Sequence, residues 1–357
     1  MPLVAHTELP TFQRLRQEGQ YILSPEMAEH QDIRELHIGL LNMMPDSAIE
    51  ATERQFLRLL GACNQIVQFH IHLFTIDGLE RSEATKEHLR RHYEPFEKIQ
   101  QDGLDGLIVS GANVTHATLP IESFWQPLTE VFDWAKKNVT STLCSCLATH
   151  ALIEYCYGVQ RTHFDKKHWG VFSHRVIENR HPLVADINSR FDVIHSRYNE
   201  IFRKDIEAAG LRVLVESEQA GFHLAVSPDL FRVVFFQGHP EYDAVSLMKE
   251  HKREVYCFHS DDREDYPPYP VGFFGENAIE ILDNYKQKVI QAKQIGTAIP
   301  DYPETAVVNY LDNTWRDTAK AVFNNWLGGI YRITHQDRRL PFMEHIDPDN
   351  PFNLTLD

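Results

Sequence analysis

Residues 139–158 read VTSTLCSCLATHALIEYCYG. The run that ends at Ser145 is short, largely apolar and contains β-branched residues, as expected for a buried strand. The segment 147–157 has the length and apolar content of a helix, and the glycine after it commonly ends helices. We therefore expect a strand that passes into a helix through a tight junction at Cys146, which is the repeating unit of an α/β sheet.

Similar units occur along the rest of the chain. Apolar runs or alternating patterns predict further strands at residues 36–41, 67–73, 106–110, 211–215, 222–226 and 232–236. Helical patterns predict helices at residues 49–61, 124–137 and 277–295, and an apolar pattern resumes at residues 315–333. The sequence thus predicts an α/β fold in which a mainly parallel sheet carries helices on both faces.

The composition is that of an ordinary globular protein. The 357 residues are 43% hydrophobic and 24% charged, and the formal net charge of −16 argues against nucleic acid as a partner. Five cysteines are too few and too irregular for a secreted disulfide framework, and no stretch approaches the ~20 apolar residues of a membrane span. We expect a cytoplasmic protein that binds neither nucleic acid nor a membrane. With 20 histidines in the chain, we expect some of them to titrate near neutral pH.

Cys146 is the first candidate for chemistry. At the junction its thiol would lie at the positive end of the helix dipole, which favours a thiolate. The backbone N–H of Leu147 would then be free to stabilise an oxyanion. The alternative is a buried, inert thiol.

His239-Pro240-Glu241 is the second candidate. Side chains two apart in an extended segment project to the same side, and the proline keeps the segment extended. Glu241 could therefore orient the His239 imidazole as the third member of a triad. Because the motif follows a predicted strand, it should share a sheet edge with Cys146; a surface His–Glu pair is the alternative.

Two further features involve strand ends. The turn at Gly111 and Ala112 could bring a second backbone N–H towards the thiol, or it could be an ordinary connection between strand and helix. Cys144, Cys146 and His150 could be metal ligands, but the cysteine spacing is unusual for zinc and a fourth ligand is not evident. We predict no metal.

Several segments together resemble one known family. They are NMMP at 42–45, TERQFLRLL at 52–60, DGLIVSGA at 105–112, TSTL at 140–143 before Cys146, HSRY at 195–198, GHPEYD at 238–243 and NWL at 325–327. In this order they resemble the homoserine O-acyltransferases that begin methionine biosynthesis, the homoserine O-succinyltransferase or transsuccinylase family. The resemblance implies a flavodoxin-like fold similar to class I glutamine amidotransferase domains, and a homodimer.

The resemblance also implies site residues. It makes Cys146 the acylated nucleophile, His239 the base and Glu241 its partner, with Leu147, Gly111 and Ala112 at the oxyanion. Lys167 and Ser196 match substrate-binding positions, and Arg253 matches the residue that holds the amino-acid carboxylate.

Thr115 occupies the family position that helps to choose the acyl group, normally Gly for succinyl or Glu for acetyl. Without an acidic group there, succinyl is favoured, and Lys167 could pair with its carboxylate. Asp46-Ser47 replace a basic pair that many members carry, and Leu147 replaces an aromatic residue.

The expected activity is O-acylation of L-homoserine by ping-pong transfer through a cysteine thioester, with succinyl-CoA as co-substrate and no cofactor. Homoserine O-acetyltransferase and serine O-acyltransferase are alternatives within the family. An amidotransferase-like Cys/His/Glu hydrolase is a third, although Cys144 and Ala148 replace the glycines that flank the cysteine in that group. A non-catalytic regulator that binds an amino acid is the fourth.

Four parts are expected along the chain. They are an N-terminal arm at 1–35, a catalytic α/β domain at 36–257, an excursion atypical of the family at 258–311, and a C-terminal segment at 312–357 that packs on the catalytic domain. The acidic run at 259–265 and the PPYP sequence at 267–270, which cannot continue a helix or a central strand, indicate the excursion.

Overall fold

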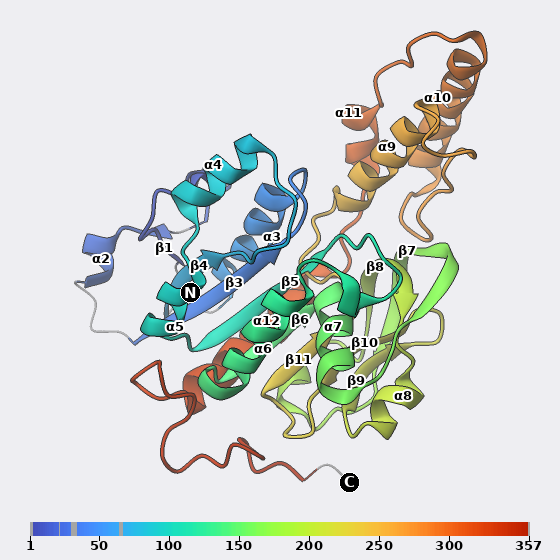
Figure 1. The fold of residues 1–357 in the computed structure, drawn as a ribbon. Helices are drawn as coiled ribbons and strands as arrows, with labels where there is room; N and C mark the ends of the chain where they lie inside the picture. Colours follow the sequence, from blue (N-terminus) through green and yellow to red (C-terminus); the bar gives the residue numbers. More distant parts are fainter. Residues whose placement is uncertain (1–2, 21, 30–33, 64–66, 356–357) are drawn as a thin grey trace.

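The computed structural model describes residues 3–20, 22–29, 34–63 and 67–355. Their strands form one sheet in the order β2-β1-β4-β3-β5-β6-β11-β10-β9-β7-β8 (Figure 1). The strands are β1 (Leu3–Val4), β2 (Ile22–Leu23), β3 (Glu35–Met43), β4 (Gln68–Phe74), β5 (Gly106–Ala112), β6 (Ser141–Ser145), β7 (Thr162–Val176), β8 (Arg190–Glu200), β9 (Arg212–Ser217), β10 (Gly221–Val226) and β11 (Val233–Phe236). Neighbours from β2 to β11 are parallel, and those from β11 to β8 are antiparallel.

Helices cover both faces of the sheet. They are α1 (Pro10–Gln17), α2 (Pro25–Glu29), α3 (Ile49–Gly61), α4 (Glu83–His92), α5 (Phe96–Asp102), α6 (Trp125–Asn138), α7 (Leu147–Tyr157), α8 (Arg203–Ala208), α9 (Ser246–His259), α10 (Glu276–Ile295), α11 (Glu304–Val307) and α12 (Arg316–Ile333). One apolar core lies between the sheet and α1, α3 and α12, and a second lies between the sheet and α6, α7 and α8. The predicted α/β class with a mainly parallel sheet is confirmed.

The sequence missed the hairpin formed by β7 and β8. These long strands pair antiparallel, with a register shift between His163 and His168. The first half of β7 is largely exposed and polar, so it has neither the apolar run nor the clean alternation that predicts a strand. This first half of β7 is stabilised by its pairing with β8, which is a non-local contact.

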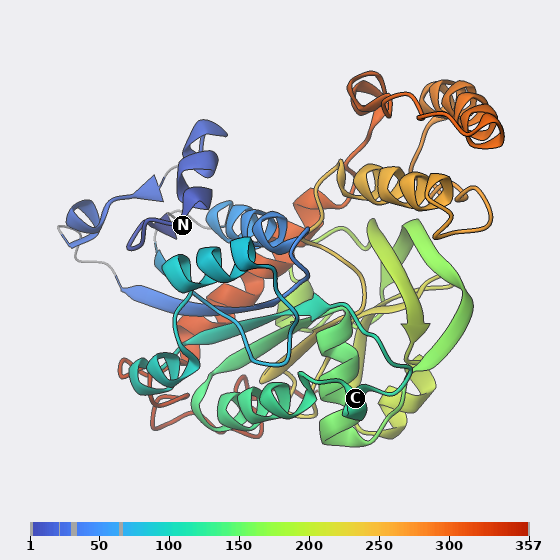
Figure 2. The same cartoon turned by 45° about the horizontal axis from the view of Figure 1, so that its top comes forward.

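Helices α9, α10 and α11 stand clear of the sheet above the β7–β8 hairpin (Figure 2). They enclose their own apolar core, which includes Val255, Leu282 and Trp315 and meets the hairpin at Trp169 and Ile194. The predicted helix at 277–295 is confirmed as α10. No helix in the described ranges is long and apolar enough to span a bilayer.

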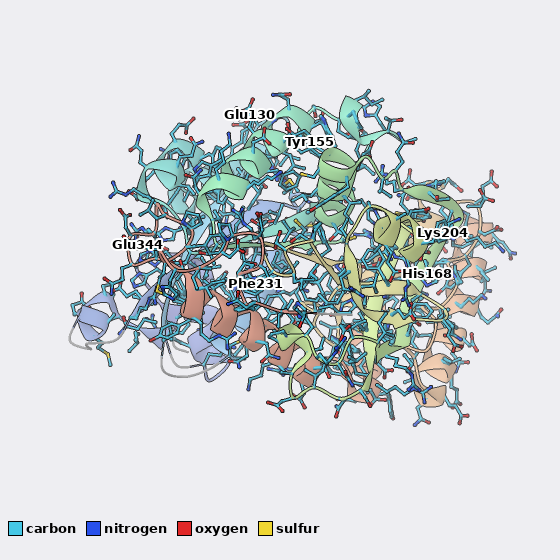
Figure 3. All side chains as sticks on the ribbon, turned by 90° about the horizontal axis from the view of Figure 1, so that it is seen from below. Glu130, Tyr155, His168, Lys204, Phe231 and Glu344 are labelled. Carbon is cyan, nitrogen blue, oxygen red and sulfur yellow. The ribbon has the colours of Figure 1, made fainter. Side chains whose placement is uncertain are left out.

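The C-terminal helix α12 packs tightly on the sheet. Trp326 is fully buried, and its Nε1 donates to Ser141 Oγ at 2.8 Å. A Cβ at Gly329 would lie 2.6 Å from the ring of Phe231, so a larger residue there would force this buried ring to shift. Figure 3 shows Phe231 beside α12 in the interior, where it also packs edge-on against Phe352 at 4.6 Å. The end of the chain is therefore tied to the centre of the fold.

Many of the histidines are buried in neutral form. His181 is an example: its Nε2 donates to Leu230 O at 2.8 Å, and its Nδ1 accepts from Leu183 N at 3.2 Å. Burial lowers the pKa of His181 to about 4, and burial likewise lowers the pKa of His174 to about 4 and of His150 to about 3. Protonation of His181 would remove the lone pair that accepts from Leu183.

We predict that stability is lost on acidification. These histidines bind protons in the unfolded chain near pH 6.5 and in the folded chain only near pH 4 or below. Their contribution is complete above pH 6.5 and is lost progressively as the pH falls towards 4, by on the order of 1 kcal/mol or more each. Urea unfolding between pH 8 and pH 4.5 measures this. The variant His181→Gln, which keeps a donor and an acceptor at every pH, should show a shallower loss; an equal loss would contradict the assignment.

Candidate active site

The β6–α7 junction holds Cys146 in a strained conformation. Its φ is 53° and its ψ is −109°, values that side-chain-bearing residues rarely adopt. Two donors maintain it: Cys146 N donates to Phe236 O at 2.8 Å, and Thr149 Oγ1 lies 2.9 Å from both Cys144 O and Phe236 O. The end of β11 thus fixes the turn after β6, where Cys146 lines a cleft.

His239 and Glu241 lie beside this thiol. His239 Nδ1 is 2.9 Å from Glu241 Oε1, and its ring also interacts with the Cys146 side chain. Both side chains are buried. Burial alone would lower the pKa of His239, but the charges of Cys146 and Glu241 and the hydrogen bonds with both raise it well above its usual value. The surroundings of His239 therefore favour its cationic form.

The predicted residues converge on one cleft of about 710 Å³. Nine of the ten line it, namely Gly111, Ala112, Thr115, Cys146, Leu147, Lys167, Ser196, His239 and Arg253. Glu241 lies behind His239 instead of on the cleft wall. A Cβ at Gly111 would be 3.8 Å from Cys146 Cβ and 4.0 Å from Leu147 N, so the strand end of β5 lies directly against the junction. Leu147 begins α7, which leaves its N–H outside the helical hydrogen-bond ladder.

Glu250 on α9 is a cleft residue that the sequence analysis missed. Its carboxylate accepts from Lys167 Nζ at 2.8 Å, Ser196 Oγ at 2.6 Å and Tyr242 OH at 2.9 Å. Burial raises its pKa, but Lys167 and these hydrogen bonds outweigh burial and hold the pKa below its usual value. Lys167, expected to pair with the succinyl carboxylate, is thus already paired in this structure. The only feature of the sequence that could have indicated Glu250 as a site residue is its spacing from Arg253, one helical turn further on.

Thr115 lies on an exposed loop at the cleft wall. Its N and its Oγ1 donate to the carboxylate of Glu122, at 2.8 and 3.0 Å. The same loop is held from the other side by Arg161, whose Nη2 donates to the backbone oxygens of His116 and Ala117 at 3.3 and 3.0 Å. Arg161 itself lines the cleft and was also missed.

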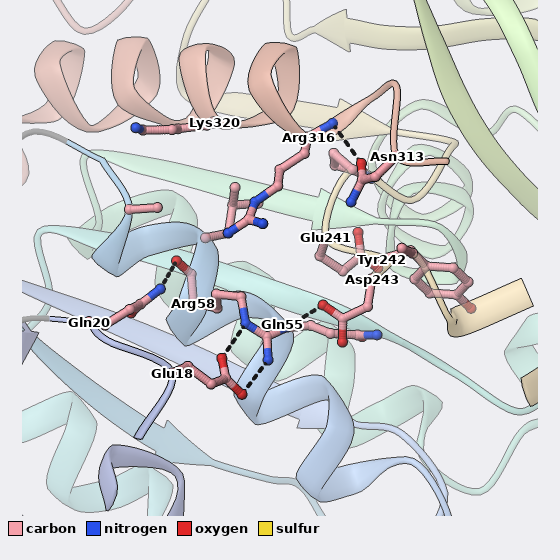
Figure 4. Close-up of a pocket in the computed structure, with 14 residues that line it drawn as sticks. Glu18, Gln20, Gln55, Arg58, Glu241, Tyr242, Asp243, Asn313, Arg316 and Lys320 are labelled. Carbon is pink, nitrogen blue, oxygen red and sulfur yellow. Dashed lines mark hydrogen bonds and ion pairs between the residues drawn. The ribbon is translucent and has the colours of Figure 1, made fainter. Parts of the chain in front are cut away.

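A second, smaller cavity lies behind the triad (Figure 4). Arg58 of α3 joins Glu18, at 2.8 Å, to Asp243, which lies two residues after Glu241. Glu241 and Tyr242 also border this cavity. The loop that carries His239 and Glu241 is therefore fixed from behind by an ion-pair network with α3 and the N-terminal segment.

The alternative of a metal bound by Cys144, Cys146 and His150 is not supported. Cys144 is fully buried in the core beneath α7. Within the described ranges, the groups of side chains with metal-ligand spacing do not include any of these three residues.

The fold and the cleft describe an α/β protein with a Cys/His/Glu thiol site, and comparison with known proteins gives its family. The homoserine O-succinyltransferase family matches residues 2–336. A homoserine O-succinyltransferase of Methylococcus capsulatus is 69% identical over 355 residues, which are 99% of this chain and the whole of that relative. One of Methylobacter tundripaludum is 64% identical over 354 residues, again 99% of this chain and the whole relative. The chain belongs to the homoserine O-succinyltransferase family and is an acyltransferase.

Among solved structures, a glutamine amidotransferase of Thermotoga maritima is similar with a TM-score of 0.41 and 11% identity. The likeness covers 84% of this chain and 99% of that one.

We predict that the charge on Glu241 controls the reactivity of Cys146. In Glu241→Gln the imidazolium loses its carboxylate partner, so alkylation of Cys146 by iodoacetamide should slow about tenfold, equivalent to ~1.4 kcal/mol on the ion pair. Peptide mass spectrometry measures the rate, with exposed Cys156 as internal control and buried Cys144 remaining unlabelled. An unchanged ratio of Cys146 to Cys156 labelling would show that Glu241 has no such role.

Proposed function

We propose that the protein transfers the succinyl group of succinyl-CoA to the hydroxyl of L-homoserine through a thioester on Cys146, a step of methionine biosynthesis. The observation that carries this proposal is the line Cys146–His239–Glu241 at a strained strand-to-helix junction in an open cleft. The relatives named above, homoserine O-succinyltransferases of nearly equal length, support the choice of donor and acceptor.

In the first half-reaction the Cys146 thiolate attacks the thioester carbonyl of succinyl-CoA. The N–H of Leu147 and an N–H of Gly111 or Ala112 stabilise the oxyanion. When the tetrahedral intermediate collapses, the bond to the CoA sulfur breaks, and His239 gives its proton to that sulfur. One thioester replaces another, so the acyl group stays reactive.

In the second half-reaction His239 acts as the base. Acylation removes the negative charge of Cys146, which was one of the two charges that raised the pKa of His239. The imidazole is therefore neutral in the acyl-enzyme and accepts the proton of the homoserine hydroxyl as the oxygen attacks the thioester. Collapse releases the O-acyl product and restores the thiolate–imidazolium pair. Glu241 orients the ring through both steps.

The acceptor's amino-acid group fits the cleft wall formed by α9. Glu250 offers a carboxylate for an ammonium group, and Arg253, one turn further on, offers a guanidinium for a carboxylate. Lys167, Ser196 and Tyr242 hold Glu250 in place. An ammonium and a carboxylate on one carbon match this pair of charges, which supports an amino acid as the acceptor.

The succinyl carboxylate requires a cation, and we assign it to Arg161. Lys167 is engaged by Glu250, whereas Arg161 lines the cleft beside the Thr115 loop and uses only Nη2 in hydrogen bonds to that loop. A neutral residue at 115 leaves the approach to Arg161 open.

An acyl-enzyme is the test of the proposed function. Incubation of the wild-type protein with succinyl-CoA, without homoserine, should add about 100 Da to the peptide that contains Cys146, whereas an acetyl group would add about 42 Da. Cys146→Ala should give no adduct and no turnover, and Cys144→Ala should keep most of the activity. Rapid hydrolysis in place of transfer to homoserine would favour a hydrolase, and the absence of any adduct would favour a binding protein.

Donor choice should depend on the charge at position 115. Thr115→Glu would place a carboxylate beside Glu122 and on the path of the succinyl carboxylate, a like-charge contact that costs several kcal/mol where water is excluded. We expect the ratio of kcat/KM for succinyl-CoA over acetyl-CoA to fall in this variant and in Arg161→Gln. Thr115→Gln is the control for size. If Gln and Glu at 115 change the ratio equally, the effect is steric and the charge argument is wrong.

A further inference from the structure

A cluster of histidines and glutamates lies at the end of the sheet away from the cleft. Cys146 follows the carboxyl end of its strand, whereas this cluster starts at the amino end of β3. His37 and His70 are register partners on β3 and β4, and His72 lies two residues further along β4. The full cluster comprises His6, Glu35, His37, His70, His72 and Glu94. The mechanism above uses none of these side chains.

We propose that His6, His72 and Glu94 bind a divalent transition-metal ion such as Zn²⁺. Each offers one ligand atom, and these atoms lie within 4.8 Å of one another. His72 Nδ1 and Glu94 Oε1 are 2.7 Å apart. Two imidazole nitrogens and one carboxylate oxygen are a donor set that suits Zn²⁺, with a further position left for water. The three residues come from the segment before α1, from β4 and from the turn between α4 and α5.

The three ligand side chains are already oriented by contacts of the atoms that would not bind the metal. His6 Nδ1 is 3.2 Å from Val4 O, and since a carbonyl only accepts, Nδ1 carries the proton and Nε2 keeps its lone pair. That Nε2 is buried and has no hydrogen-bond partner among the residues that the structure describes. His72 Nε2 is 2.8 Å from His37 Nδ1, and Lys98 contacts the second oxygen of Glu94. Such supporting contacts orient ligands at protein metal sites.

The neighbouring trio of Glu35, His37 and His70 is a weaker candidate. Glu35 Oε2 lies 3.4 Å from His37 Nε2 and 3.7 Å from His70 Nε2. However, the guanidinium of Arg338 is 2.8 Å from His37 Nε2, which places a positive charge on the atom that would bind the metal. Glu35 is also 47% exposed, whereas Glu94 is 15% exposed. We therefore assign the metal ion to His6, His72 and Glu94.

A bound ion would connect three segments that are far apart in sequence. His6 precedes α1, and the two-residue strand β1 gives that part of the chain only a short pairing with β4. A metal ligated by His6 and His72 would add a strong bond between them. We therefore expect the ion to stabilise the N-terminal segment against the sheet and to leave acyl transfer unaffected.

Zinc binding to the full-length protein tests the proposal. The Cys146→Ala variant is used throughout, because the active-site thiol could itself bind zinc. After removal of metals with a chelator, Zn²⁺ is titrated in competition with a chromogenic chelator. We expect one equivalent, and a loss of affinity of at least about tenfold in His6→Gln and in Glu94→Gln. Visible absorption of the Co²⁺ form reports whether the ligand field is tetrahedral.

His70→Gln is the matched control, because it removes a histidine of the cluster outside the assigned trio. It should bind zinc as tightly as the parent. Circular dichroism and thermal melting confirm folding, and ligand variants in two separate segments keep the test valid if one does not fold. Zinc binding that is absent, that survives both ligand substitutions, or that is lost in His70→Gln but not in His6→Gln would overturn the proposal.

Discussion

The hydrogen bond from Cys146 N to Phe236 O is the interaction on which the site depends. It joins the turn after β6 to the end of β11, and Thr149 reinforces it by contacting carbonyl oxygens of both strands. Because β11 continues directly into the loop that carries His239, the same contact helps to set the distance between the side chains of Cys146 and His239. The strain at Cys146, with φ at 53°, persists because these hydrogen bonds hold the junction in place.

The buried charged groups of the cleft are paired with partners. Cys146 and Glu241 flank His239, while Glu250 is surrounded by Lys167, Ser196 and Tyr242. Burial makes an unpaired charge costly, so each of these groups is stable only with its partners. This explains why Lys167 is not available to pair with the carboxylate of the proposed succinyl donor. Breaking its ion pair would leave the buried carboxylate of Glu250 without its main counter-charge.

The sequence predicted what is local and missed what is made by distant contacts. The β6–α7 unit and the pair His239 and Glu241 follow from periodicity and from spacing along one strand end, and the structure places them together. Glu250 could not be found in this way, because its partners come from the β7–β8 hairpin, whose polar outer half gives no strand signal. The ion pair between Lys167 and Glu250 was not predicted for the same reason. The family resemblance indicated which residues belong to the site, but only the folded structure shows which of them, such as Lys167, already have an ion-pair partner.

Two histidines of this protein show how neighbours decide the state of a buried imidazole. Burial lowers the pKa of both His239 and His37. At His239 two negative partners, Cys146 and Glu241, overcome burial and hold the ring cationic. At His37 the nearest charge is the Arg338 guanidinium, which acts with burial and lowers the pKa to about 2. A neutral imidazole can accept a hydrogen bond or support a metal ligand, whereas an imidazolium can give a proton to a leaving thiolate. The same side chain therefore accepts or donates hydrogen bonds near the amino end of β3 and, in the proposed mechanism, transfers protons near the carboxyl end of β11.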